Sequence, residues 1–212
     1  MTTTITNTMI DIVKVKATED YFPVSWQIGI RCNYDCMYCP AEYHNDTDPS
    51  HSLETLQKAW ISLYEQSHSL GLKYKIAFTG GEPTINKDLI PFLQWLRDEY
   101  GDRMLQIIVA SNGSANYKYY RRLYEVVDSV SFSTHSEHID EKKFFDTIIK
   151  LKQTLHPSKF IHVNIMDEYW NKENTQRWEK ILLDHDVSYS TNTIHYEAGH
   201  RDKIIFKNKN ED

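Results

Sequence analysis

Residues 24–40 read VSWQIGIRCNYDCMYCP, an apolar stretch that runs directly into a loop with three cysteines. The apolar part predicts a buried strand over residues 24–30, because a short apolar run of this kind is typical of parallel sheets. Cys32, Cys36 and Cys39 are the only cysteines among the 212 residues. Their odd number argues against a framework of structural disulfides.

Five further β-rich runs follow, and a segment of helical periodicity separates each run from the next. The expected strands cover residues 73–79, 104–110, 127–133, 159–166 and 187–196. Six βα units, each about thirty residues long, predict parallel strands joined by right-handed crossovers. Six units are too few for a closed eight-stranded barrel. The pattern therefore fits an open doubly wound sheet or a partial barrel.

Three residues mark expected helix boundaries. Gly71 is a candidate C-cap for the helix that begins near residue 53. Pro91 must lie in the first turn of its helix or kink it. Asp140 is a candidate N-cap. An additional short strand is expected at residues 9–16, at an edge of the sheet or at the floor of the barrel.

Composition narrows the class of protein. A chain of 212 residues suits one domain with a substantial core. No apolar run is long enough to span a membrane, and the N-terminus lacks the basic start and apolar block of a signal peptide. The formal net charge of -6 disfavours a broad nucleic-acid interface. We therefore expect a soluble, cytoplasmic protein that binds neither membrane nor nucleic acid.

Polar and glycine-containing segments follow the expected strands, at the ends where parallel α/β folds place their chemistry. The segments are TGGEPT at residues 79–84, SNG at 111–113 and SFSTHSEH at 131–138. The fifth strand carries Asn164, and the sixth carries Asn192 and His195. Each segment alone could be an ordinary turn. Several of them at one rim indicate a functional site, because chain folding does not require this convergence.

The cysteine spacing, C-x3-C-x2-C, suits an iron–sulfur cluster. Three thiolates can hold three irons of a [4Fe–4S] cluster, and such clusters ordinarily take four cysteines. The fourth iron would then have an open coordination position for another ligand, just as a catalytic zinc ion keeps one position open. Zinc is the alternative for the loop, because His44 lies at a spacing that suits a Cys3His site.

On these motifs the chain resembles the radical S-adenosylmethionine (SAM) enzymes. The C-x3-C-x2-C loop follows the first strand with Tyr38 before its third cysteine, and GGEP follows the second strand at residues 80–83. The resemblance extends over roughly residues 24–196. It implies an α/β fold, a partial (β/α)6 barrel with a parallel sheet. It also implies a single core domain across residues 1–212, with a short N-terminal strand and a C-terminal tail.

The resemblance also implies cofactors. Cys32, Cys36 and Cys39 would ligate a [4Fe–4S] cluster, and SAM would bind the open iron. Reduction would split SAM and give a 5′-deoxyadenosyl radical that abstracts hydrogen from a substrate, while the protein orients the reactants. The expected SAM contacts are Gly80, Gly81 and Glu82 at the ammonium, Tyr38 beside the adenine, Ser111 and Asn112 at the ribose hydroxyls or the carboxylate, Ser133 at the methionine portion and Asn164 at the ribose.

The expected partners are an electron donor of the flavodoxin or ferredoxin type and an unidentified small-molecule or modified-residue substrate. His135 is the first choice for a substrate contact, ahead of His138 and His195. The open side of the barrel would be closed by substrate, by a partner chain or by a second copy in a homodimer. The alternative function is a non-catalytic iron–sulfur or zinc-binding accessory protein with the same fold.

Overall fold

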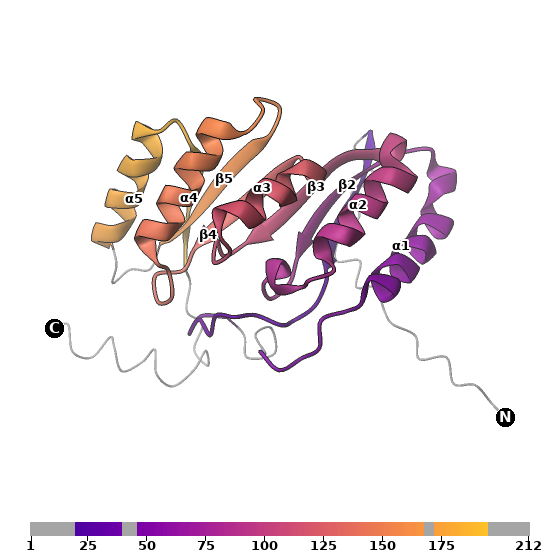
Figure 1. The fold of residues 1–212 in the computed structure, drawn as a ribbon, viewed down its shortest axis with the longest axis horizontal. Coiled ribbons are helices and arrows are strands. Elements are labelled where there is room, and N and C mark those ends of the chain that lie inside the picture. Colours follow the sequence, from indigo (N-terminus) through magenta and orange to yellow (C-terminus); the bar gives the residue numbers. More distant parts are fainter. Residues whose placement is uncertain (1–19, 40–45, 168–171, 195–212) are drawn as a thin grey trace.

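The computed structural model describes residues 20–39, 46–167 and 172–194, which form one parallel sheet covered by helices (Figure 1). The strands are β1 (Tyr21–Gln27), β2 (Lys73–Thr79), β3 (Met104–Ser111), β4 (Ser129–Thr134), β5 (Phe160–Asp167) and β6 (Ser188–Thr193). They lie in the order β1-β2-β3-β4-β5-β6, and every neighbouring pair is parallel. In the described residues β1 does not pair with β6, so the sheet is open, as expected for a partial barrel.

The helices connect successive strands and lie on one face of the sheet (Figure 1). They are α1 (Leu53–Ser67), α2 (Leu89–Tyr100), α3 (Tyr117–Val126), α4 (Glu141–Thr154) and α5 (Lys172–Asp184), with short 3-10 turns η2 (His68–Leu70), η3 (Pro83–Ile85) and η4 (Gly101–Arg103). Crossovers of one hand place all the helices on the same side of a sheet with sequential strand order. None of the described helices combines the length and the apolar character needed to cross a bilayer.

The helix boundaries follow from local chemistry. The side chain of Asp140 accepts a hydrogen bond from the backbone nitrogen of Lys143 at 3.1 Å, which confirms Asp140 as the N-cap of α4. Gly71 has a φ of 71° and ends the turn that follows α1. Pro91 is the third residue of α2, in the first turn, where its missing N–H costs no intrahelical hydrogen bond.

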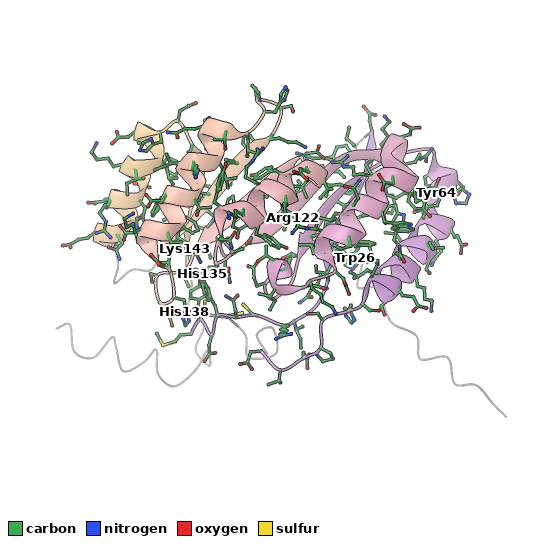
Figure 2. The ribbon with its side chains drawn as sticks, in the orientation of Figure 1. Trp26, Tyr64, Arg122, His135, His138 and Lys143 are labelled. Atoms are coloured by element: carbon green, nitrogen blue, oxygen red, sulfur yellow. The ribbon has the colours of Figure 1, made fainter. Side chains whose placement is uncertain are left out.

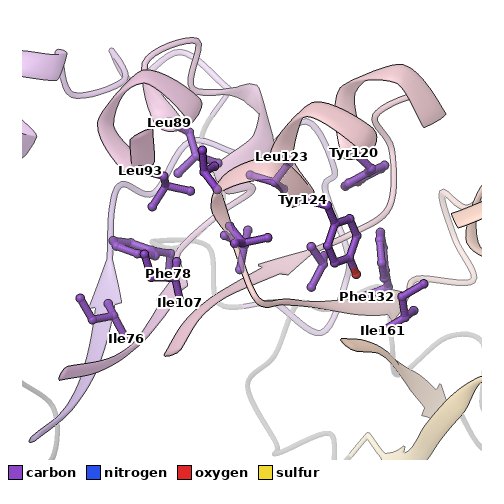
Figure 3. Packing of buried hydrophobic residues seen from close by; sticks show 14 of the residues in the cluster. Ile76, Phe78, Leu89, Leu93, Ile107, Tyr120, Leu123, Tyr124, Phe132 and Ile161 are labelled. Atoms are coloured by element: carbon purple, nitrogen blue, oxygen red, sulfur yellow. The ribbon is translucent and has the colours of Figure 1, made fainter. Parts of the chain in front are cut away.

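The hydrophobic core lies between the sheet and the helices (Figure 3). Phe78, Ile107 and Phe132 point from the strands toward the helices, where they meet residues such as Leu93 and Leu123. The strands are buried only at alternate positions. The first strand, expected to be buried, is buried on the face that carries Val24 and Trp26, and its other face is less buried because no described helix covers the second face of the sheet.

The strand boundaries agree with the sequence in most places. The structure confirms the strand at 73–79, and β3, β4 and β5 lie within two residues of the expected ranges. The first strand is shifted, because it begins at Tyr21 and ends at Gln27, before Gly29 turns the chain with a φ of 153°. Among the described residues β1 pairs only with β2, so Pro23 is tolerated in a strand whose other side has no described partner strand.

Some expectations lie outside the described residues. They concern the strand at residues 9–16, the C-terminal tail and the end of the sixth strand beyond Ile194. The same holds for His44 and His195.

Candidate functional site

The cysteine loop leaves the carboxyl end of β1 and crosses the rim of the sheet. Its three cysteines form no disulfide, and Cys36 is only 4% exposed while the other two are half-buried. The backbone nitrogen of Cys39 donates to the carbonyl oxygen of Cys36 at 3.1 Å, which closes a turn between them. The backbone nitrogen of Tyr34 lies 3.4 Å from the sulfur of Cys32. The loop thus has a defined local fold around its sulfur atoms.

The three thiols line one cavity of about 180 Å³ together with the ends of β2, β3 and β4. All but one of the site residues predicted from the sequence line it. They are Cys32, Cys36, Cys39, Tyr38, Gly80, Gly81, Glu82, Ser111, Asn112, Ser133 and His135. The cavity is also lined by Tyr34, Thr79, Pro83 and Ala110, which the sequence analysis missed although they lie within or beside the motifs.

Glu82 connects the segments that follow β2 and β3. Its carboxylate is 3% exposed. It accepts hydrogen bonds from the backbone nitrogen of Thr84 at 3.0 Å, the hydroxyl of Thr84 at 2.6 Å, the hydroxyl of Ser111 at 2.9 Å and the backbone nitrogen of Asn112 at 2.6 Å. Burial raises the pKa of Glu82, and the hydrogen bonds act in the opposite direction. Its contact with an ammonium group stays a prediction.

Gly80 and Gly81 allow two backbone segments to pack directly against each other. The nitrogen of Gly81 donates to the carbonyl oxygen of Gly29 at 3.0 Å, and the nitrogen of Glu82 donates to that of Arg31 at 2.8 Å. A Cβ on Gly80 would lie 2.2 Å from the oxygen of Gly29, and one on Gly81 would lie 2.2 Å from the oxygen of Arg31. Glycine is therefore required here for steric reasons, and the contact fixes the start of the cysteine loop.

His135 follows the carboxyl end of β4 and lies against the cysteine loop. Figure 2 labels it near His138. Its Nδ1 atom is 3.5 Å from the sulfur of Cys36 and is hydrogen-bonded to the hydroxyl of Tyr38. Burial, and to a smaller extent His138, lowers the pKa of His135 to about 4, so the ring is neutral at pH 7. Its contact with substrate stays a prediction, as does that of His138, whose ring stacks on Tyr34.

Asn164 is the predicted site residue that does not line the cavity. It pairs in register with Ser133, which does line it, and both lie on the uncovered face of the sheet. Its amide donates to the hydroxyl of Ser131 at 2.8 Å and accepts from Ser190 at 3.0 Å and from Asn192 at 3.3 Å. Asn164 thus belongs to a polar network beside the cavity.

The donor set fits a metal–sulfur centre. In the described residues no three His, Cys, Asp or Glu side chains are gathered closely enough to hold a metal ion, so the thiols must turn toward one another to share a ligand. Burial raises the pKa of Cys36 to about 12 and also raises that of Cys32, which keeps these thiols protonated at neutral pH. Three soft sulfur donors on one loop beside an open cavity suit iron–sulfur or zinc coordination.

A second hollow, of about 430 Å³, lies on the other side of the GGEP segment. It is lined by Trp26, Ile28 and Arg31, by the segment before α1 and by Glu82 and Pro83, which it shares with the cysteine cavity. No sequence motif indicates this hollow, because the segments that line it share no pattern.

Comparison with known families gives a match over much of the chain. The model of the Radical SAM superfamily matches residues 26–164, which is more than half of the sequence. This range begins in β1 and ends within β5, so it includes the cysteine loop and the segments that line the cavity.

Two curated relatives are GTP 3′,8-cyclases. A probable GTP 3′,8-cyclase of Pyrococcus abyssi is 31% identical over 114 residues, which are 53% of this chain and 34% of the relative. The GTP 3′,8-cyclase of Thermodesulfovibrio yellowstonii is 33% identical over 127 residues, 59% of this chain and 37% of the relative. The alignment therefore spans little more than a third of either relative.

Among solved structures, the crystal structure of BtrN in complex with AdoMet and 2-DOIA is similar, with a TM-score of 0.52. The match covers 82% of this chain and 70% of BtrN at 18% sequence identity. At this identity the likeness shows a shared fold.

Proposed function

Because the chain belongs to the radical SAM superfamily, whose members bind a [4Fe–4S] cluster and SAM, we propose that it is an enzyme that uses both. The observation that supports the proposal most directly is that one cavity is lined by the GGEP segment and by three cysteines that form no disulfide. When bound, the reduced cluster and SAM supply a 5′-deoxyadenosyl radical that abstracts hydrogen from a substrate. The protein binds the cofactors, orients the reactants and shields them from water.

Cys32, Cys36 and Cys39 would hold the cluster. Each thiol must lose its proton to do so, and metal binding favours this loss even where burial opposes it. Because the loop packs against the glycine segment through backbone contacts, the backbone at the start of the loop and the GGEP segment would keep a fixed relative position while the thiols turn toward the cluster.

The segments after β2 to β4 would hold SAM, with Gly80 and Gly81 offering backbone carbonyl oxygens. Glu82 would accept from the ammonium through Oε2, the oxygen that also accepts from Asn112. A carboxylate oxygen has two lone-pair directions, so a second donor fits there. In the family pattern Tyr38, Ser111, Asn112, Ser133 and Asn164 would complete the contacts.

Substrate would approach from the uncovered face of β4 to β6. This face carries neutral hydrogen-bonding side chains beside the cavity, among them Ser131, Asn164 and Ser190. A radical reaction must exclude water, so substrate, a partner chain or a second copy would close the face. A flavodoxin- or ferredoxin-like protein would supply the electron. We take no substrate from the GTP 3′,8-cyclases, because the alignment spans so little of their length.

The test is anaerobic reconstitution of the full chain with iron and sulfide, followed by addition of reductant and SAM. We expect about four irons per chain and formation of 5′-deoxyadenosine, slow without substrate. Cys36→Ala should lose the cluster while keeping its secondary structure, because the loop lies at the rim, outside the core between sheet and helices. Stoichiometric zinc without labile sulfide would refute the proposal. A cluster that never cleaves SAM would favour the non-catalytic accessory protein.

A further inference from the structure

Three residues that follow β4, His135, Glu137 and His138, contact the cysteine loop that follows β1. About 100 residues of sequence separate the partners. We call the side chains of His135, Glu137 and His138 the clamp. Each of them meets a different part of the loop, and neither the motifs nor the sequence spacing indicated these contacts.

Glu137 provides the charged contact of the clamp. Its two carboxylate oxygens lie 3.1 and 3.4 Å from the backbone nitrogen of Met37, which donates to them. Met37 lies inside the turn between Cys36 and Cys39. A hydrogen bond from a backbone N–H to an ionised carboxylate is stronger than one between neutral groups. Glu137 therefore holds the turn that sets the spacing of these two sulfur atoms.

The two histidines make the aromatic contacts. The ring of His138 stacks on Tyr34, with centroids 5.0 Å apart and planes 25° apart. The ring of His135 lies nearly parallel to Tyr38, with centroids 5.9 Å apart. Tyr34 and Tyr38 flank Cys36 in sequence. The clamp thus fixes the aromatic residues on both sides of this cysteine.

From this geometry we infer that the clamp is a positioning device, which holds the cysteine loop in place before any cluster is bound. Ordering a free loop costs conformational entropy for each residue fixed, and the clamp makes that ordering part of folding. This inference gives His135 a positioning role at the cluster loop, and its contact with substrate stays a separate prediction. Its consequence for the cluster rests on the proposed function, whereas the ordering of the loop does not.

Once Cys36 is an iron ligand, its sulfur has no proton and can only accept hydrogen bonds. The Nδ1 atom of His135 lies 3.5 Å from that sulfur and also contacts the hydroxyl of Tyr38, so in the tautomer with a proton on Nδ1 both the sulfur and the hydroxyl oxygen can accept from it. Hydrogen bonds to cluster sulfur atoms help set the reduction potential, because they stabilise the more negatively charged, reduced state. His135 would therefore also make the cluster easier to reduce.

The first experiment uses the metal-free full chain and needs no cluster. Iodoacetamide labelling of Cys36 is followed by peptide mass spectrometry in wild type, Glu137→Ala, Glu137→Gln and His138→Ala, with folding checked by circular dichroism. We expect labelling several-fold faster in Glu137→Ala than in Glu137→Gln, because both variants lose the carboxylate charge near Cys36 and only the amide oxygen of glutamine still accepts from Met37. Glu125→Ala, on the exposed side of α3, is the matched control and should label like wild type.

His138→Ala is the second variant, in case Glu137→Ala does not fold, and it should also label faster than wild type. Wild-type rates in every folded clamp variant would overturn the inference, because the loop would then hold its own shape. Faster labelling in a protein that never assembles a cluster would support the clamp and refute the proposed function. The two failures are therefore distinguishable.

The second experiment measures the midpoint potential of the reconstituted cluster by electron paramagnetic resonance. His135→Ala should lower the potential while the iron content stays near that of wild type, because one donor to sulfur is lost. An unchanged potential would show that His135 does not donate to the cluster.

Discussion

The carboxylate of Glu82 accepts a hydrogen bond from the backbone nitrogen of Asn112, 2.6 Å away, and so joins the loops that follow β2 and β3. The same carboxylate also holds Thr84 and Ser111. Two motifs that lie thirty residues apart in the sequence thus meet at one buried side chain. Glu82, which we expect to contact SAM, therefore also connects the loops that follow two neighbouring strands.

Glu82→Ala should destabilise the cofactor-free protein. It leaves buried donors of Thr84, Ser111 and Asn112 without their acceptor, and each unsatisfied buried group costs about 1–3 kcal/mol. We expect the free energy of unfolding in urea to fall by about 3 kcal/mol or more. Glu54→Ala is the control, because this exposed glutamate forms a surface ion pair with Lys58 one turn along α1, and its loss should be small. Equal losses in the two variants would contradict the structural role.

Glu82→Ala should also weaken SAM binding more than it weakens the cluster. A hydrogen bond to a charged group contributes about 1.5–3 kcal/mol, so affinity should fall about tenfold or more. Titration of reconstituted wild type and variant with SAM measures this change, and the iron content is the internal control. Equal affinities would leave Glu82 with a structural role alone.

Gly81→Ala should separate the GGEP segment from the start of the cysteine loop. The new Cβ would lie 2.2 Å from the carbonyl oxygen of Arg31 and 2.5 Å from that of Ile30, and backbone atoms cannot move aside cheaply. We expect lower stability and reduced iron uptake. Gly101→Ala is the matched control, because nothing lies within 4 Å of its Cβ and its φ of -52° suits alanine. Similar stability in the two variants would show that the close packing is unimportant.

Asn164→Ala tests whether the polar network beside the cavity belongs to the SAM site. If Asn164 contacts the ribose, loss of one hydrogen bond of about 1 kcal/mol should weaken SAM binding several-fold while the iron content stays constant. Asn192→Ala is the control, because Asn192 contacts the oxygen of Asn164 at 3.3 Å from the edge strand. Unchanged SAM affinity in Asn164→Ala would show that this hydrogen-bond network serves substrate binding or the stability of the sheet, and not SAM binding.

Alkaline pH should destabilise the protein through Tyr124. Burial raises the pKa of Tyr124 above its ordinary value of 10, so the unfolded chain loses this proton at a lower pH than the folded protein does. The resulting stability is fully present below about pH 10 and is lost as the pH rises above that value. In urea unfolding, Tyr124→Phe should therefore show a shallower loss of stability above about pH 10 than wild type.

Tyr124→Phe should also be slightly less stable than wild type near neutral pH. The hydroxyl of Tyr124 donates to the carbonyl oxygen of Phe160 at 3.0 Å, and such a bond contributes about 1 kcal/mol. Identical pH dependence in wild type and Tyr124→Phe would show that this phenol does not set the alkaline limit.

The sequence by itself determined the number and the parallel direction of the strands and most of the cavity lining, whereas their order in the sheet comes from the structure. Cys32, Gly80 and Ser111 could be assigned to one site because each follows a strand, and the carboxyl ends of parallel strands meet at one rim. Only short-range patterns were needed for this, since hydrophobic periodicity sets each element and the crossover rule sets their direction.

The tertiary structure alone decided how the side chains at the rim are used. It shows the contact of His135 with Cys36, the hold of Glu137 on Met37, the four hydrogen bonds of Glu82 and the position of Asn164 outside the cavity. These contacts join residues that lie up to 100 positions apart in the chain. Local propensity carries no information about such pairs, because the direction of a side chain in a loop depends on the distant elements that pack against it.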